Sequence, residues 1–154
     1  MLACKYIVFK QNKGASMKAE ECIFFQLAKA SQAGTRFWIK RVSSLGLTAV
    51  QGVVIRFLHD NDRQTSSELG RKTDLDSATL TGVIDRLEGA GFVQRRQNPD
   101  DRRSIRIHLT EKGRAAGEKV AQLMEEANRE FLREFNVSEE VALRSLLSKV
   151  RESG

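Results

Sequence analysis

The sequence predicts a mainly α-helical protein with one small two-stranded β-ribbon. Apolar residues recur at helical spacing through most of the 154 residues, whereas the segment 92–109 alternates in the period of a strand. No internal repeat or low-complexity linker interrupts these patterns, and the length suits a single domain with its own core. The predicted order is four helices, a hairpin and two further helices.

The composition indicates a globular protein with a basic surface. Charged residues make up 30% of the chain, and 26 lysines and arginines against 20 aspartates and glutamates give a formal net charge of +6. This excess favours a polyanionic partner, although many basic proteins bind no nucleic acid. No apolar run approaches the ~18 residues of a membrane span, and Cys4 and Cys22 form neither a disulfide framework nor a metal motif. We expect a cytoplasmic protein with no metal, no cofactor and no membrane partner.

Two helices are predicted in the first part of the chain. Residues 1–16 are treated as an N-terminal extension of unknown role, because a well-patterned helix begins only after them. That helix is predicted over residues 18–42, and Gly46 marks the break that follows. Thr48 is expected to cap the second helix, which closes at the polar residues 60–62.

Two shorter helices follow. The first, residues 65–73, opens with a threonine followed three residues later by Glu68, which is the spacing of a capping box. The second, residues 76–88, carries a single apolar stripe. Gly89 and Gly91 are expected to take the left-handed conformations that end it.

The last third of the chain is predicted as a hairpin followed by two helices. Residues 92–96 and 103–109 alternate as strands, and residues 97–102 between them are expected to form the tip. A long helix is predicted over residues 110–135, and Ser138 with the two following glutamates is expected to cap the last helix.

The helix over residues 76–88 has the properties of a DNA-reading helix. A helix fits the major groove, with its N-terminal residues nearest the base edges. Mostly small hydrogen-bonding side chains lie opposite the apolar stripe, namely Ser77, Thr79, Thr81, Gly82, Asp85 and Arg86. The preceding helix begins with hydroxyls, where Ser66 and Ser67 can hold a phosphate. The alternative interpretation is a solvated helix face without a DNA-binding role.

Arginines concentrate in the hairpin. Five lie between residues 95 and 106, yet Asp100 and Asp101 stand at the centre of this segment, directly after Pro99. An arginine that enters the narrow minor groove must be held in one extended rotamer, and a carboxylate two residues away can grip its guanidinium. We therefore expect Asp101 to aim Arg103, while Asp100 caps the turn.

The other hairpin arginines are expected to face phosphates. They are Arg95, Arg96, Arg102 and Arg106. The alternative is an exposed hairpin whose surface ion pairs contribute little.

The run 98–113, NPDDRRSIRIHLTEKG, resembles the wing signature of the MarR family of transcriptional regulators. Its core matches position by position, as Asp101-x-Arg103-Ser104 followed by Ile107-x-Leu109-Thr110-x-x-Gly113. Residues 68–96 are similar to the family's helix-turn-helix, and the resemblance is strong over residues 47–115. By this resemblance, Asp101 and Arg103 are the wing-tip pair. Ser77, Ala78, Thr79 and Thr81 lie at the base-reading end of the recognition helix.

The resemblance implies a homodimer that binds a pseudo-palindromic operator in double-stranded DNA, usually as a repressor. It implies one MarR-type domain over residues 17–154, with dimerisation helices at 17–46 and 114–154 and a winged helix-turn-helix lobe at 47–113. The apolar stripes of the end helices independently favour dimerisation, because they would leave a large exposed patch on a monomer. The same stripes could also pack within one chain.

Two kinds of signal are compatible with this resemblance. Regulators of this kind often bind small aromatic or phenolic anions, and the candidate lining residues are Phe37, Trp38, Arg41, Phe57 and His59. Ordinary core positions are the alternative interpretation of these residues.

Cys22 offers a second route, because one branch of the family senses peroxides through a cysteine near the start of the first helix. Glu20 and Glu21 disfavour a thiolate there, and the sole tyrosine of the chain, Tyr6, departs from that branch's pattern. An inert, buried cysteine is the favoured alternative.

The sequence disfavours two other classes of protein. An enzyme is disfavoured, because neither His59 nor His108 has an acid–base partner in the sequence and no glycine-rich phosphate loop is present. No catalytic residue is therefore predicted. A non-specific architectural winged-helix protein would bind random DNA about as well as a palindrome, whereas a regulator prefers its operator by roughly 10³-fold or more.

Overall fold

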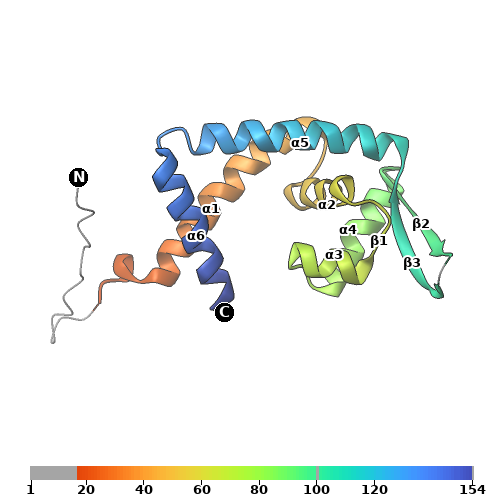
Figure 1. Ribbon diagram of the computed structural model, residues 1–154, viewed down its shortest axis with the longest axis horizontal. Helices are drawn as coiled ribbons and strands as arrows, with labels where there is room; N and C mark the ends of the chain where they lie inside the picture. Colours follow the sequence, from red (N-terminus) through yellow and green to blue (C-terminus); the bar gives the residue numbers. More distant parts are fainter. Residues whose placement is uncertain (1–16, 100, 154) are drawn as a thin grey trace. The chain divides into compact units, whose positions relative to one another are not determined.

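The computed structural model describes residues 17–99 and 101–153 (Figure 1). The expected N-terminal extension, residues 1–16, and the expected turn cap Asp100 lie outside the described residues. The chain divides between Ala33 and Gly34 into two compact units, which are described separately. The mainly α-helical class with a small β-ribbon is confirmed by the order of the elements.

The first unit contains a 3-10 turn and the start of α1. The turn covers Ala19–Glu21, and α1 covers Ile23–Val42 and continues into the second unit. The prediction of one continuous helix from residue 18 is therefore wrong at its beginning, where Cys22 has an extended backbone with ψ 121°.

The capping predictions for α2 are confirmed. After a second 3-10 turn, Ser43–Leu45, Gly46 takes the left-handed conformation with φ 68°. Thr48 caps α2, Ala49–Asp60, because its hydroxyl oxygen accepts the Gln51 backbone N–H at 3.2 Å. The Gln51 side chain in turn accepts the Thr48 backbone N–H at 2.9 Å.

The two short helices form a helix-turn-helix made of α3, Ser66–Thr73, and α4, Ser77–Gly89. Thr65 and Glu68 form the predicted capping box of α3. Asp74 in the turn has a left-handed backbone with φ 54°. After α4, Gly91 is left-handed with φ 75°, but the same prediction for Gly89 is wrong, because Gly89 is the last helical residue.

A three-stranded antiparallel sheet follows the order β1-β3-β2. Its strands are β1, Gln64–Thr65, β2, Val93–Asn98, and β3, Asp101–Leu109. The predicted tip at 97–102 is too long, because strand pairing continues to Asn98 and Asp101. The buried Asn98 amide donates a hydrogen bond to Ser104 Oγ at 2.9 Å, which supports this extension. The two-residue β1 is too short for a period-2 pattern and was not predicted.

Two helices complete the chain, α5, Glu111–Phe131, and α6, Val137–Glu152. The predicted end of α5 at residue 135 is wrong, because the backbone N–H of Phe135 closes a turn onto the Leu132 carbonyl. The predicted cap of α6 at Ser138 is also wrong. Asn136 caps this helix, and its side chain and that of Glu139 form a capping box.

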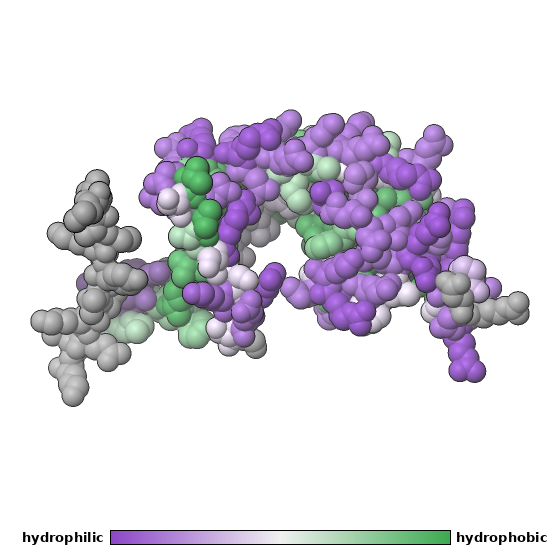
Figure 2. Space-filling view, viewed as in Figure 1, coloured by the Kyte–Doolittle hydropathy of each residue, from purple (hydrophilic) through white to green (hydrophobic). Residues whose placement is uncertain are grey.

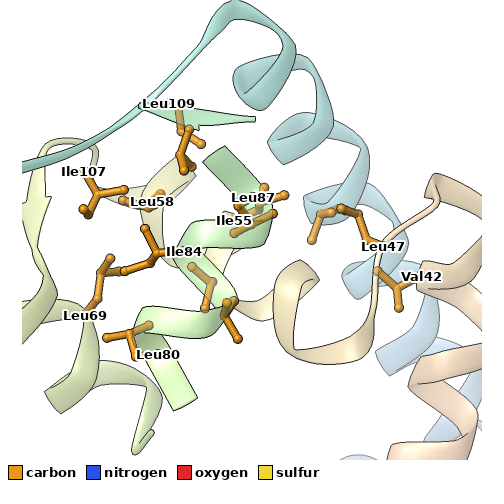
Figure 3. Packing of buried hydrophobic residues seen from close by; sticks show 14 residues of the cluster. Val42, Leu47, Ile55, Leu58, Leu69, Leu80, Ile84, Leu87, Ile107 and Leu109 are labelled. Atoms are coloured by element: carbon orange, nitrogen blue, oxygen red, sulfur yellow. The ribbon is translucent and has the colours of Figure 1, made fainter. Parts of the chain in front are cut away.

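The core joins α2, α3, α4 and β3 (Figure 3). It includes the buried residues Ile55, Leu58, Leu69, Leu80, Ile84, Leu87, Ile107 and Leu109. Asp62 ties the end of α2 to the same core, because its Oδ1 accepts the Leu109 backbone N–H at 2.8 Å. The end of α2 and strand β3 are thereby fixed to one another.

In the described part of the chain, no single helix combines the length and the apolar character needed to cross a bilayer. Length and composition are met only by the bent pair 23–45 and 49–60, with 73° between its members.

Candidate nucleic-acid interface

The N-terminal part of α4 presents its small side chains to solvent, as predicted for a DNA-reading helix. Ser77, Ala78, Thr79 and Thr81 are all exposed, whereas the opposite stripe is buried. Two of the hydroxyls donate hydrogen bonds within the helix, Thr79 to Asp76 Oδ2 at 2.6 Å and Thr81 to the Ser77 carbonyl at 2.7 Å. Each hydroxyl oxygen also has lone pairs that can accept a hydrogen bond.

Asp76 fixes the start of this helix. Its Oδ1 accepts the Thr79 backbone N–H at 2.8 Å. Hydrogen bonds from the Thr79 side chain and then from its backbone lower the pKa of Asp76. The carboxylate therefore stays charged at the positive end of the helix dipole.

Gly82 and Arg86 form one local unit on α4. A β-carbon at position 82 would lie 3.7 Å from Arg86 Nη2, so the guanidinium extends back along the helix over the glycine. Arg86 is exposed. Its charge is therefore directed toward the N-terminal part of α4.

A cavity of about 340 Å³ lies between α3 and α4. It brings together Ser66 and Ser67 of α3 with Ser77 of α4. Arg71 also lines this cavity and was missed from the sequence, because a single arginine late in a short helix carries no distinctive pattern. Hydroxyls beside a guanidinium can hold a phosphate oxygen.

Arg95 was predicted to face a phosphate, but the structure binds it to the recognition helix. Its Nη2 forms an ion pair with Asp85 at 2.6 Å, and its Nη1 forms another with Glu88. The Arg95 backbone N–H also donates to Glu88 Oε1 at 2.8 Å. Burial alone would lower the pKa of Arg95, but hydrogen bonds to the two carboxylates raise it. Position 95 lies on the face of β2 that is turned toward α4, which explains the difference.

The wing-tip pair is arranged differently from the predicted guanidinium grip. Asp101 Oδ1 accepts the backbone N–H of Arg103 at 3.0 Å. Among the described residues, the Arg103 guanidinium and the Asp101 carboxylate form no ion pair, and Arg103 is exposed. Asp101 therefore shapes the turn instead of holding the arginine side chain. Arg102 lies in β3 between them, and its side chain lies outside the described residues.

Arg96 and Arg106 lie opposite one another in the hairpin, as direct partners of β2 and β3. Successive side chains of a strand point to opposite faces, so these two lie on the face away from α4 and Arg95. Arg96 is exposed and Arg106 is half-buried. The hairpin thus uses its arginines on both faces.

Comparison with known proteins identifies the family. The model of the MarR family matches residues 47–105. The HTH-type transcriptional repressor NicR of Pseudomonas putida is 31% identical over 127 residues, which cover 82% of this chain and 80% of NicR. The chain belongs to the MarR family.

Further relatives agree with this assignment. The organic hydroperoxide resistance transcriptional regulator of Bacillus subtilis is 31% identical and covers 73% of this chain and 77% of its own. A mutant MarR from E. coli, solved with operator DNA, is 29% identical with a TM-score of 0.78 over 88% of this chain and 99% of that chain. This MarR-family protein is therefore a transcriptional regulator that binds DNA and is not an enzyme.

A solved relative also concerns a small molecule. BpsR of Bordetella bronchiseptica is 28% identical, with a TM-score of 0.83 over 89% of this chain and 98% of that chain. Its structure was solved to explain how 6-hydroxynicotinic acid regulates its DNA binding.

The MarR-family chain has a cavity of about 350 Å³ between α1, α2 and α5, called here the aromatic cavity. Its lining consists of Gly34, Phe37, Trp38, Val53, Met124, Ala127, Asn128 and Phe131. The Phe37 and Phe131 rings meet edge to face, with centroids 5.1 Å apart. A second cavity of about 260 Å³ lies across Trp38, and it reaches Thr73 and Leu75 of the helix-turn-helix.

The five predicted effector residues are only partly brought together. Phe37 and Trp38 line the aromatic cavity, and Trp38 Nε1 donates a hydrogen bond to the Ala49 carbonyl at 3.1 Å. Arg41 lies over the Phe37 ring at 4.8 Å and forms an ion pair with Glu130.

Phe57 and His59 do not line this cavity. Phe57 lies one turn beyond Val53 on α2 and packs against the core. His59 packs against α5, where a β-carbon on Gly117 would approach its ring within 2.7 Å. His59 Nδ1 also lies 3.3 Å from Arg56 Nη1.

Cys22 lies at the junction between the first 3-10 turn and α1. It is a half-buried free cysteine, and its carbonyl accepts the Gln26 backbone N–H at 3.1 Å. Within residues 17–99 and 101–153, no group of histidine, cysteine and acidic side chains is arranged to hold a metal ion.

Proposed function

We propose that this regulator is a homodimeric repressor that binds a pseudo-palindromic operator in the cytoplasm and is released by a small aromatic or phenolic acid. The observation that carries this proposal is the combination of a polar helix-turn-helix and wing with the aromatic cavity. Residues 47–113 would form the DNA-binding lobe, and residues 17–46 and 114–154 would supply the dimerisation helices.

Exposed apolar side chains support the dimer. Along one side of α6, Leu146 is 59% exposed, Leu147 51% and Val150 44%. Figure 2 shows apolar surface over this helix. Phe131 and Phe135 near the end of α5 are also exposed. An apolar face of this extent marks an interaction surface, and a second copy of the chain presents the same face for a symmetric contact.

The relatives support an operator and a repressor. NicR is named as a repressor, and the E. coli MarR mutant was solved with operator DNA. In a dimer, two α4 helices would enter successive major grooves about 34–36 Å apart. The wings would reach into the flanking minor grooves.

The aromatic cavity supports an aromatic acid as the effector. Its phenylalanine and tryptophan rings suit a planar ligand, and Asn128 adds one polar side chain. Arg41, stacked on Phe37, could exchange Glu130 for the ligand carboxylate. Trp38 separates this cavity from the one that reaches the α3–α4 turn, so a shift of its ring would move the recognition helix.

Footprinting of the upstream DNA of its own gene tests the proposal. We expect a protected palindrome that salicylate or 6-hydroxynicotinic acid releases. Release only by cumene hydroperoxide would instead favour Cys22 as a redox sensor, a second candidate motivated by the similarity to the B. subtilis hydroperoxide regulator. Uniform binding to all DNA would favour the architectural class and contradict the operator.

A further inference from the structure

A second cavity in the wing collects positive charge. This cavity, the outer-sheet pocket, has a volume of about 380 Å³ and is lined by Arg63, Arg96, Gln97, Pro99, Arg106 and His108. Three of the six residues are arginines and a fourth is a histidine. Of the described residues that line it, none is acidic. The pocket therefore has the chemistry of an anion site.

The backbone places these positively charged side chains close to one another. Arg96 and Arg106 are direct cross-strand partners, and like charges in such positions repel each other. Arg63 joins them from the residue before β1, with a left-handed backbone at φ 62° that is uncommon outside glycine. Asp62 Oδ1 stabilises this conformation by accepting the Arg63 backbone N–H at 2.9 Å. The Glu68 carboxylate of α3 already interacts with the charge of Arg106, and an anion in the pocket would add negative charge beside Arg63 and Arg96.

The charge of the pocket acts on His108. Burial lowers the pKa of His108, and the positive charges of Arg96, Arg63 and Arg106 lower it further, while Asp62 opposes them. These four charged groups face the imidazole from β2, β3 and the segment before β1. His108 therefore lies among the cations that line the pocket.

The pocket extends from the base of the sheet toward the wing tip. Gln97 and Pro99 line it and lie beside the turn that carries Asp101 and Arg103. A duplex whose minor groove receives Arg103 would therefore run past the mouth of the pocket. A guanidinium fork is suited to two oxygens of one phosphate.

We propose that the outer-sheet pocket is a phosphate site that takes a backbone phosphate of double-stranded DNA beside the minor groove entered by the wing. The proposal rests on the proposed DNA-binding role of the wing and adds Arg63 and His108 to it. Neither residue belongs to the helix-turn-helix or to the wing tip. Free inorganic phosphate has the same chemistry, so the experiment must separate the two sources.

The first test compares operator affinities by fluorescence anisotropy over a range of salt concentrations. Arg63→Asn removes the charge and keeps a side chain that tolerates the left-handed backbone. We expect about threefold to tenfold weaker binding. The slope of log affinity against log salt concentration should be smaller in magnitude by about one for each bound protomer. Arg129→Gln, which removes a charge from the exposed side of α5, is the matched control and should change neither quantity.

The second test measures operator affinity as a function of pH, and partial unfolding of a variant would not produce the expected pH dependence. Phosphate contact favours protonated His108, whose pKa lies below its ordinary value. Operator affinity of the wild type should therefore rise only as the pH falls below the ordinary titration range of an imidazole. His108→Gln should abolish this rise. Circular dichroism checks that each variant remains folded.

The outcomes separate the pocket from the wing. Wild-type affinity and slope in Arg63→Asn, with binding lost in Arg103→Ala, would overturn the pocket and leave the wing proposal intact. Wild-type binding by both variants would overturn the proposed function of the wing as well. A further outcome is that inorganic phosphate shifts the NMR resonances of His108 in the wild type but not in Arg63→Asn, while Arg63→Asn binds the operator with wild-type affinity. This result would identify free phosphate as the ligand of the pocket and exclude DNA.

Discussion

Arg95 forms ion pairs with two carboxylates of α4. Asp85 and Glu88 lie on the recognition helix, where their charges would repel phosphates. Arg95 bonds to both carboxylates and fixes α4 against β2. The same contacts set the charge and the orientation of the reading helix.

We predict that Arg95→Ala weakens operator binding about tenfold, because two carboxylates lose their counter-charge. Adding Asp85→Asn and Glu88→Gln to this variant should restore most of the affinity, measured by anisotropy. If Arg95 instead contacts a phosphate, the triple variant will bind as weakly as Arg95→Ala alone.

A second residue-level prediction concerns Asp101, whose carboxylate accepts the Arg103 backbone N–H. Asp101→Asn keeps an oxygen acceptor and should retain near-wild-type operator affinity, whereas Asp101→Ala should lose several-fold. Arg103→Ala should lose at least tenfold, because it removes the side chain that we propose enters the minor groove. Equal damage from the asparagine and alanine variants of Asp101 would show that its charge, and not its acceptor, is required.

The helices depend on local caps and on close approaches. Thr48, Thr65, Asp76, Thr110 and Asn136 each accept a backbone N–H at the start of a helix. Gly117 within α5 is buried against α2. Capping residues therefore set where helices begin, whereas this glycine allows α5 and α2 to pack closely.

Gly117→Ala should reduce the free energy of unfolding by about 1–3 kcal/mol, because its β-carbon would overlap the His59 ring and β-carbon. Gly34→Ala is the matched control within α1. A β-carbon there meets no atom within 4 Å, and alanine favours the helix by up to about 1 kcal/mol. Urea unfolding measures both changes, and equal effects would disprove the close approach.

The capping box of α3 should make stability depend on pH. Hydrogen bonds from the Thr65 backbone and then from its side chain lower the pKa of Glu68. A carboxyl whose pKa is lower in the folded state contributes stability above its unfolded pKa, and this contribution is lost as the pH falls through the folded value. Glu68→Gln should therefore flatten the dependence of the unfolding midpoint below about pH 5. An unchanged pH profile would contradict this role.

The single chain exposes more apolar surface on α6 than a monomer normally tolerates. Leu146 and Leu147 share one side of α6 with Val150, and Ser145 lies nearly opposite at helical spacing. The proposed dimer gives these leucines a partner.

Leu146→Glu should therefore convert a dimer into a monomer in light-scattering measurements, and operator affinity should fall with it. Ser145→Glu introduces the same charge on the other side of α6 and should leave the dimer intact. A monomeric wild-type protein, or a dimeric Leu146→Glu variant, would contradict the proposed use of this surface.

The sequence by itself determined the helix-turn-helix, the hairpin and most helix starts. Capping boxes and the left-handed Gly46 and Gly91 depend on only a few neighbouring residues, so the sequence alone predicts them. The sequence-based prediction misplaced the end of α5, because Leu132 to Phe135 remain apolar enough to continue a helical pattern after the chain has turned.

Only the tertiary structure decided which side chains meet. Arg95 could be assigned to Asp85 and Glu88 only once β2 lay against α4. The two-residue β1 exists through its pairing with β3, and this pairing places Arg63 beside His108 in the outer-sheet pocket. Such contacts join segments far apart in the chain, so local propensity does not encode them.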